Sequence, residues 1–149
     1  MLLPAALPAP ARGGFTTRFG GVSSAPYSGL DLALHVGDDP ADVAVNRARL
    51  AEAVGVLPGA LVFAEQVHGC GVAVVEAAQA TAVPAVDALV TAAPGLALVV
   101  LAADCLPVLL ADQRQGSSPS PTLVGGGWSR ASCRRPWPRW LLWGRRLRA

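Results

Sequence analysis

The chain has 149 residues, enough for one domain with a hydrophobic core. Hydrophobic residues make up 52% of it, but they form no run of 18, so the sequence predicts no membrane-spanning helix. Its three cysteines show no paired spacing, which argues against a disulfide framework and for a reducing, cytoplasmic setting.

The net charge of +2 conceals two segments of opposite character. Residues 1–112 carry four arginines and ten acidic residues, a balance of −6, whereas residues 113–149 carry eight arginines and no acidic residue, a balance of +8. All four tryptophans also lie in the second segment. We therefore divide the chain into a loose leader (1–14), a domain (15–112) and a basic tail (113–149).

The first part of the domain predicts one strand and a loop. Residues 15–19 alternate and are rich in β-prone types, which is typical of a strand. Residues 20–29 are rich in Gly, Ser and Pro, and this composition predicts a loop. A short apolar segment, 30–36, follows.

The clearest predicted element is a helix over residues 42–54. Apolar residues recur there at helical spacing. Asp38 or Asp39 is suited to cap its amino end, and Gly55 is suited to end it.

The rest of the domain is read as strands. Residues 61–64 predict a strand, and 71–75 predict its hairpin partner across a Gly-containing turn. Residues 86–91 form another short strand, and the apolar runs 96–101 and 108–112 are typical of strands buried on both faces. Because strands outnumber helices and their order is mixed, we expect an α/β domain with a mixed or antiparallel sheet, and not a doubly wound one.

Two polar sites interrupt this apolar pattern. Asp104 and Cys105 stand between the last two apolar runs, where the chain is expected to turn. His68 stands beside a glycine after the strand at 61–64. A histidine and a cysteine are suitable zinc ligands, and a catalytic zinc site uses three protein ligands and one open position. The alternative is that Cys105 is a buried free thiol that packs as a small hydrophobe.

Other candidates are less specific. His35 is the only other histidine, and its apolar surroundings favour a core or loop role. Arg18 precedes a Gly-Gly turn and suits a phosphate or carboxylate, or else it is a surface arginine paired with an acid. Asp87 and Asp104 are candidates for proton transfer or for orienting a ligand, and the plainer interpretation of each is a turn residue.

Six motifs then occur in a fixed order along the chain. They are Thr17-Arg18-Phe19-Gly20-Gly21-Val22-Ser23, Leu34-His35-Val36-Gly37-Asp38-Asp39-Pro40, Asn46-Arg47, Gln66-Val67-His68-Gly69, Asp87-Ala88-Leu89-Val90-Thr91 and Ala103-Asp104-Cys105-Leu106-Pro107-Val108-Leu109. Together they resemble the laccase-domain, or multicopper polyphenol oxidase, family, whose members are purine nucleoside phosphorylases. The resemblance covers about residues 15–112.

The resemblance implies a compact αβ sandwich and a zinc ion held by two histidines and one cysteine. It implies phosphorolysis of adenosine, inosine and methylthioadenosine, with adenosine deamination, so that the partners are a purine nucleoside and phosphate. An older assignment in the family is copper-dependent phenol oxidation, and copper also suits these ligands. By position, His68 and Cys105 are two of the three metal ligands, and Arg18 is a contact for substrate or phosphate. Asp31 stands where the family often has Asn.

The main departure from the family follows Asp112. The family continues with a strand and a His-Ala-Gly-Trp-Arg-Gly motif that supplies the third ligand, but no histidine follows His68 in this chain. Given plausible GC-rich codons, the same bases read two positions later permit Gly-Val-Val-Ala-Val-Ala-His and then Ala-Gly-Arg over residues 115–130. Our hypothesis is that the tail is translated out of frame.

An out-of-frame tail would leave the C-terminal part truncated or disordered, without the strand and helix of the family, and would impair activity. The alternative is a genuine basic tail that binds nucleic acid through Arg and Trp, but no recognisable nucleic-acid-binding module accompanies it, so no such partner is expected. A non-catalytic remnant of the fold is a second alternative.

Overall fold

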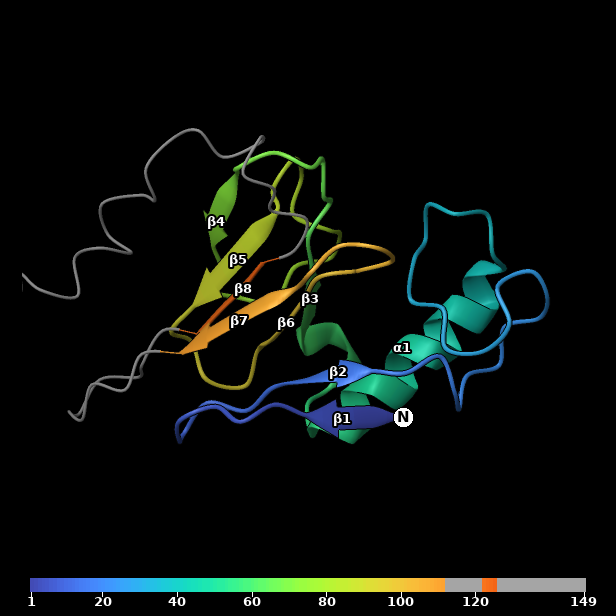
Figure 1. The fold of residues 1–149 in the computed structure, drawn as a ribbon, viewed down its shortest axis with the longest axis horizontal. Coiled ribbons are helices and arrows are strands. Elements are labelled where there is room, and N and C mark those ends of the chain that lie inside the picture. The colour runs from blue at the N-terminus through green and yellow to red at the C-terminus, as the bar shows by residue number, and fades with distance from the viewer. Residues whose placement is uncertain (112–121, 126–149) are drawn as a thin grey trace, which may run out of the picture.

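The computed structural model describes residues 1–111 and 122–125, which form one α-helix and three small sheets (Figure 1). Elements in chain order are β1 (Leu2–Pro4), β2 (Gly14–Thr16), α1 (Pro40–Val54), the 3-10 turn η1 (Pro58–Ala60), β3 (Leu61–Phe63), β4 (Val72–Val74), β5 (Ala88–Thr91), β6 (Ala97–Val99), β7 (Val108–Ala111) and β8 (Thr122–Gly125). Within these residues, no helix is both long and apolar enough to span a membrane.

The predicted helix is confirmed, with both of its caps. The Asp39 side chain accepts a hydrogen bond from the Ala41 amide (2.8 Å), and a proline occupies the first helical position. At the other end, Gly55 takes a left-handed conformation (φ 77°) and its N–H donates to two carbonyl groups of the last turn. The helix therefore begins two residues before the predicted start, because Pro40 fits the first turn without losing a hydrogen bond.

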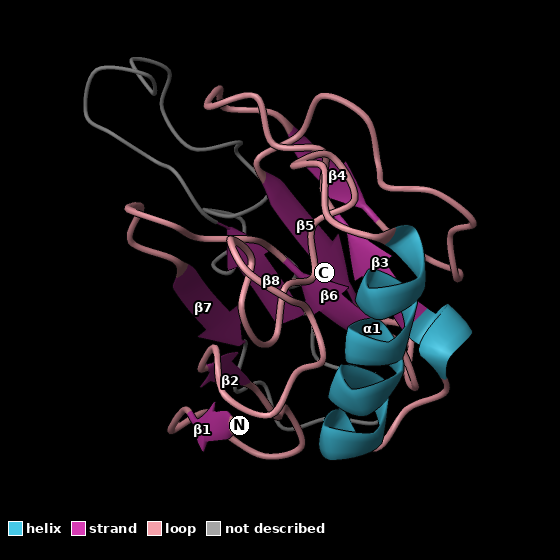
Figure 2. Cartoon of the chain, turned by 90° about the vertical axis from the view of Figure 1, so that its right-hand side faces the viewer, coloured by secondary structure: helices cyan, strands magenta, loops and turns pink. Residues whose placement is uncertain are grey.

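A parallel pair of strands, β3 and β6, lies at the centre of the packing (Figure 2). Leu61 and Phe63 face one hydrophobic cluster, which includes Leu50 on α1. Val62 faces a second cluster, which includes Leu89 on β5. Because successive side chains of a strand point to opposite faces, β3 is buried on both sides and joins the two clusters.

The largest sheet has the strand order β4-β5-β8-β7. The β4–β5 pair is parallel, and β5–β8 and β8–β7 are antiparallel, which confirms the expected mixed sheet. The predicted hairpin between residues 61–64 and 71–75 is wrong. The connection between these strands is bonded to Asp87 and does not form a tight turn, so it carries the chain from the β3–β6 pair to the edge of the larger sheet.

Both ends of the described chain differ from expectation. Within the leader, β1 pairs with β2 in an antiparallel manner, so this segment is part of the fold. The tail was expected to offer no strand, but Thr122–Gly125 form β8 between β5 and β7. The other residues of the tail, 113–121 and 126–149, lie outside the described residues, as does the expectation about them.

A buried asparagine fastens the loop of residues 18–31 to α1. Asn46 has no exposed surface, and its amide makes four hydrogen bonds to that loop. Its oxygen accepts from the Val22 amide (2.9 Å), and its nitrogen donates to the Ser23 hydroxyl and to two carbonyl groups. Within the loop, a Cβ added to Gly21 would lie 2.0 Å from the Gly29 carbonyl oxygen, so only glycine fits there.

We predict that Asn46→Ala lowers the free energy of unfolding by about 2–4 kcal/mol, because it leaves several buried polar groups of the loop without partners. Urea unfolding followed by circular dichroism measures this. Glu52→Ala, on the exposed face of the same helix, is the matched control and should change the midpoint little. Equal midpoints for the two variants would show that the loop does not depend on Asn46.

Candidate functional site

The candidate site lies in the two loops that follow β3 and β6. These strands are parallel, with Phe63 opposite Val99, so their carboxyl ends lie at the same edge. His68 stands in the loop after β3, and Cys105 stands in the loop after β6. The loops that carry His68 and Cys105 therefore begin side by side, although 37 positions separate the two residues in the sequence.

A glutamine side chain ties these two loops together. The Nε2 atom of Gln66 donates to the Leu101 carbonyl oxygen (3.0 Å), and its Oε1 atom accepts from the Leu101 amide (2.7 Å). The side-chain amide thus bonds to Leu101 as a backbone peptide group would in a sheet. Sequence reasoning placed Gln66 in a motif but gave it no role, because nothing local indicates a partner so distant in sequence.

A buried carboxylate fixes the turn at His68. Asp87 has no exposed surface, and its two oxygens accept from the amides of His68 (2.7 Å) and Gly69 (2.8 Å). His68 has a positive φ of 57°, a conformation that is uncommon for a residue other than glycine. Of the roles considered for Asp87, the geometry favours orientation, because the carboxylate holds the backbone that carries His68.

The candidate ligands are accessible in the described structure. The His68 side chain is exposed, and Cys105 is a half-buried free thiol, so Cys105 is not a fully buried core residue. Asp104, next to Cys105, is exposed in the same loop. His35 is also exposed, in a loop. Among the described residues, no three His, Cys, Asp or Glu side chains form a cluster that could hold a metal ion.

Cys70, two positions beyond His68, is disulfide-bonded, which the lack of paired spacing among the cysteines did not predict.

Arg18 lies in a different part of the fold. Its Nε and Nη2 atoms both donate to the Ser28 carbonyl oxygen, at 3.3 and 2.9 Å. Its side chain is exposed and borders a shallow hollow of about 450 Å³, lined by Arg18, Phe19, Gly20, Ser28 and Gly29. No described contact joins Arg18 to His68 or Cys105. The guanidinium is held by a backbone carbonyl rather than by the acid considered from the sequence, and its Nη1 donors remain available for an anion.

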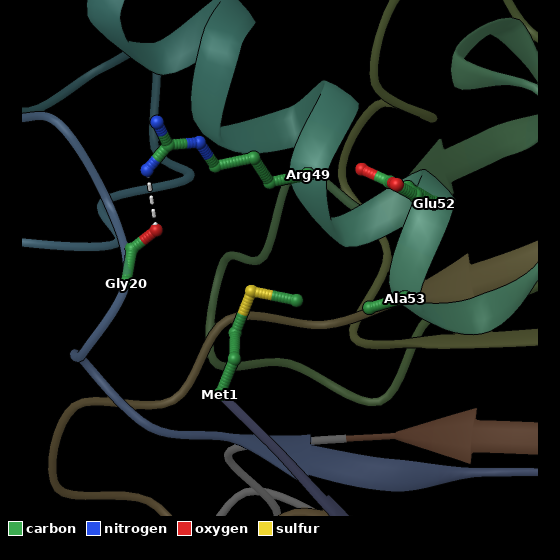
Figure 3. A pocket seen from close by; sticks show the side chains of 5 residues that line it. All are labelled: Met1, Gly20, Arg49, Glu52 and Ala53. Carbon is green, nitrogen blue, oxygen red and sulfur yellow. Dashed lines mark hydrogen bonds between the residues drawn. The ribbon is translucent and has the colours of Figure 1, made fainter.

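A second hollow, of about 480 Å³, lies beside α1 (Figure 3). It is lined by Met1, Gly20, Arg49, Glu52 and Ala53, and Arg49 donates to the Gly20 carbonyl oxygen (2.6 Å). Neither hollow includes His68, Asp104 or Cys105. The candidate site is therefore defined by the types of side chain that follow the ends of β3 and β6, and not by these open hollows.

Arg47 joins the loop of residues 30–33 to the end of β3. Its guanidinium lies 3.8 Å from the centre of the Phe63 ring and donates twice to the Leu32 carbonyl oxygen, at 2.9 and 2.7 Å. Burial lowers the pKa of Arg47, and the carboxylate of Asp31 acts in the opposite direction. The Asp31 Oδ1 atom accepts from the Ala33 amide (3.0 Å), a bond that Asn would also make, which explains why either residue suits this position.

Comparison with known proteins agrees with this fold. The family model described as multi-copper polyphenol oxidoreductase laccase matches residues 12–121. The chain is 54% identical over 109 residues to a purine nucleoside phosphorylase of Corynebacterium glutamicum, covering 72% of this chain and 44% of that protein. It is 52% identical over 119 residues to a purine nucleoside phosphorylase of Streptomyces coelicolor, covering 76% of this chain and 49% of that protein.

Solved structures give the same result. YlmD from Geobacillus stearothermophilus matches with a TM-score of 0.71 and 38% identity, over 80% of this chain and 46% of that one. YfiH from Bacillus licheniformis matches with a TM-score of 0.71 and 32% identity, over 77% of this chain and 45% of that one. The chain thus spans about half the length of the relatives it matches. It belongs to the multi-copper polyphenol oxidoreductase laccase family, as the motifs between Arg18 and Cys105 predicted.

Proposed function

We propose that the chain is the ligand-bearing part of a zinc-dependent purine nucleoside phosphorylase, with His68 and Cys105 as metal ligands. The proposed reactions are phosphorolysis of adenosine, inosine and methylthioadenosine, with adenosine deamination as a further activity. The names of the curated relatives support the enzyme class. The observation that carries the site is the parallel pairing of β3 and β6, which starts the His68 and Cys105 loops at one edge.

The donor types fit zinc, but their number leaves the coordination incomplete. An imidazole and a thiolate are ordinary zinc ligands, and a catalytic site uses three protein ligands. The described residues supply two of them at this edge, and the sequence has no histidine after His68 to serve as the third ligand. When bound, zinc would supply Lewis-acid chemistry or activate a water. With two ligands, we expect weak binding and low or no activity in this chain.

Other exposed residues have side chains that suit a nucleoside and phosphate, although Arg18 lies in a different part of the fold. Arg18 keeps guanidinium donors for an anion, and we assign it to phosphate or substrate binding. Asp104 is an exposed carboxylate adjoining Cys105, and we assign it to proton transfer. Val67 and Leu106 adjoin the two ligands in sequence and are exposed apolar side chains, which suits contact with a purine base.

Two alternatives keep the fold and change the activity. A non-catalytic remnant is favoured by the small number of metal ligands among the described residues. A copper-dependent polyphenol oxidase is consistent with the family description, because His and Cys also bind copper. Metal content and the two enzyme assays separate these alternatives from the phosphorylase.

We also propose that the tail from about Gln113 is translated out of frame. The sheet takes a strand between β5 and β7, where β8 lies. The other reading frame permits an apolar strand over residues 115–122 that ends in His, which would follow β7 directly. This proposal explains the change from −6 to +8 and the four clustered tryptophans together.

The metal assignment predicts a specific loss of zinc binding. In calorimetric titration, His68→Ala and Cys105→Ala should each abolish the weak binding of zinc, because a single remaining ligand does not hold the ion. His35→Ala is the matched control, since it removes the other exposed histidine and should leave binding unchanged. Zinc binding that survives both ligand substitutions would place the metal elsewhere.

The frame proposal predicts an error in the gene. A clean sequencing read across the codons for residues 112–116 should reveal a frame change, and an intact frame would refute it. In the corrected chain, the restored His-Ala-Gly-Arg segment should raise bound zinc and give adenosine phosphorolysis, because it supplies the third ligand. A corrected chain that binds zinc but lacks phosphorolysis would argue against the enzyme class alone.

We predict that substitutions of Asp87 destabilise the fold because they remove the hydrogen bonds that hold the His68 turn. Asp87→Ala leaves two amides without their acceptors and should lower the free energy of unfolding by about 2–4 kcal/mol. Asp87→Asn should be less destabilising, since one oxygen acceptor remains. Thermal unfolding measures both, with the exposed Glu76→Ala as control. If Asp87→Ala has the same melting temperature as Glu76→Ala, other contacts hold the turn.

A further inference from the structure

We infer that Gln66 is a positioning residue that holds the Cys105 loop against the His68 loop. Its role as a clamp between the two loops depends only on its hydrogen bonds. Its role toward a metal rests on the proposed function, in which His68 and Cys105 are ligands.

The Gln66 side chain continues the pairing of the two segments beyond their last backbone hydrogen bond. The last backbone bond between the two segments runs from the Ala64 amide to the Val99 carbonyl oxygen (3.3 Å). The next amide, of Glu65, instead donates to the Val83 carbonyl oxygen (2.9 Å), so the chain turns away from β6. Beyond that point, the described hydrogen bonds between the two loops come from the Gln66 side chain.

Only a glutamine-like side chain can make both bonds. Leu101 offers one donor and one acceptor, so its partner must accept and donate at once. A glutamate has no donor at neutral pH, and an asparagine is one methylene shorter. Leu101 is also packed against the first hydrophobic cluster, where an unpaired peptide group would be costly. These requirements explain why an amide side chain occupies position 66.

The position of the clamp makes it relevant to the site. Gln66 precedes His68 by two residues, and Leu101 lies near the start of the irregular segment that contains Asp104 and Cys105. That segment has no regular secondary structure before β7, so Gln66 fixes its start relative to the His68 loop. Asp87, which follows His68 in the sequence, fixes the His68 turn by accepting from the amides of His68 and Gly69. Together, the two side chains set where the imidazole and the thiol can meet.

The test uses the full chain and two substitutions. Gln66→Ala removes the side chain, and Gln66→Met keeps its length and bulk but loses both hydrogen bonds. Gln79→Ala is the matched control, because the Gln79 side chain is exposed and, among the described residues, its amide donates to the Ala77 carbonyl oxygen of its own loop (3.1 Å). The first measurement is amide hydrogen exchange at Leu101 without metal, with Leu50 in α1 as an internal reference. The second is zinc affinity.

In both Gln66 variants, the Leu101 amide hydrogen should exchange about tenfold faster than in the parent chain, or faster still, and the exchange rate of the Leu50 amide should not change. Zinc affinity should fall about 10–100-fold, the usual effect of losing a residue that orients ligands. Gln79→Ala should match the parent chain in both measurements. If Gln66→Met behaves like the parent, side-chain bulk and not hydrogen bonding holds the loops, and the inference is wrong.

Two further outcomes separate this inference from the proposed function. If Leu101 exchanges faster but zinc affinity is unchanged, while His68→Ala and Cys105→Ala abolish binding, Gln66 does not position the ligands. If neither ligand substitution affects zinc, the metal assignment fails, and positioning toward a metal fails with it. In that case, exchange at Leu101 still decides whether the clamp exists.

Discussion

The rest of the structure depends on the parallel pairing of β3 with β6. Because β3 is buried on both faces, it contributes Leu61 and Phe63 to one hydrophobic cluster and Val62 to the other. That arrangement favours one register, because a shift of β3 by one residue would exchange the faces of these side chains. Parallel strands end at the same edge, so the same packing that stabilises the core also starts the His68 and Cys105 loops together.

Beyond the strand ends, polar side chains replace the backbone ladder. Gln66 bonds to the Leu101 peptide group, Asp87 bonds to the His68 and Gly69 amides, and Asn46 makes four bonds to the loop of residues 18–31. Irregular segments need such partners because buried peptide groups without hydrogen bonds are costly. Each of these side chains satisfies several backbone groups, so the loops are held in place without regular secondary structure.

The sequence predicted what is local and missed what is distant. The helix was found because its periodicity, its Asp cap and its final glycine are all within one segment. The predicted hairpin is wrong because residues 72–74 pair in parallel with β5. The turn held by Asp87 and the packing of the strands determine this pairing, and neither is local in the sequence. The sequence indicates no role for Gln66, because its partner, Leu101, lies 35 positions away. His68 and Cys105 were named from a resemblance, and their common edge follows from the strand pairing.

Under the proposed function, position and affinity of the metal site have separate causes. Hydrogen bonds that involve no metal hold the starts of both ligand loops, so much of the ordering is complete before an ion binds. An additional ligand would then add its bond energy without the cost of ordering the other two. The location of the site is therefore set by Gln66, Asp87 and the β3–β6 pair, whereas its strength is set by whether a third ligand is present.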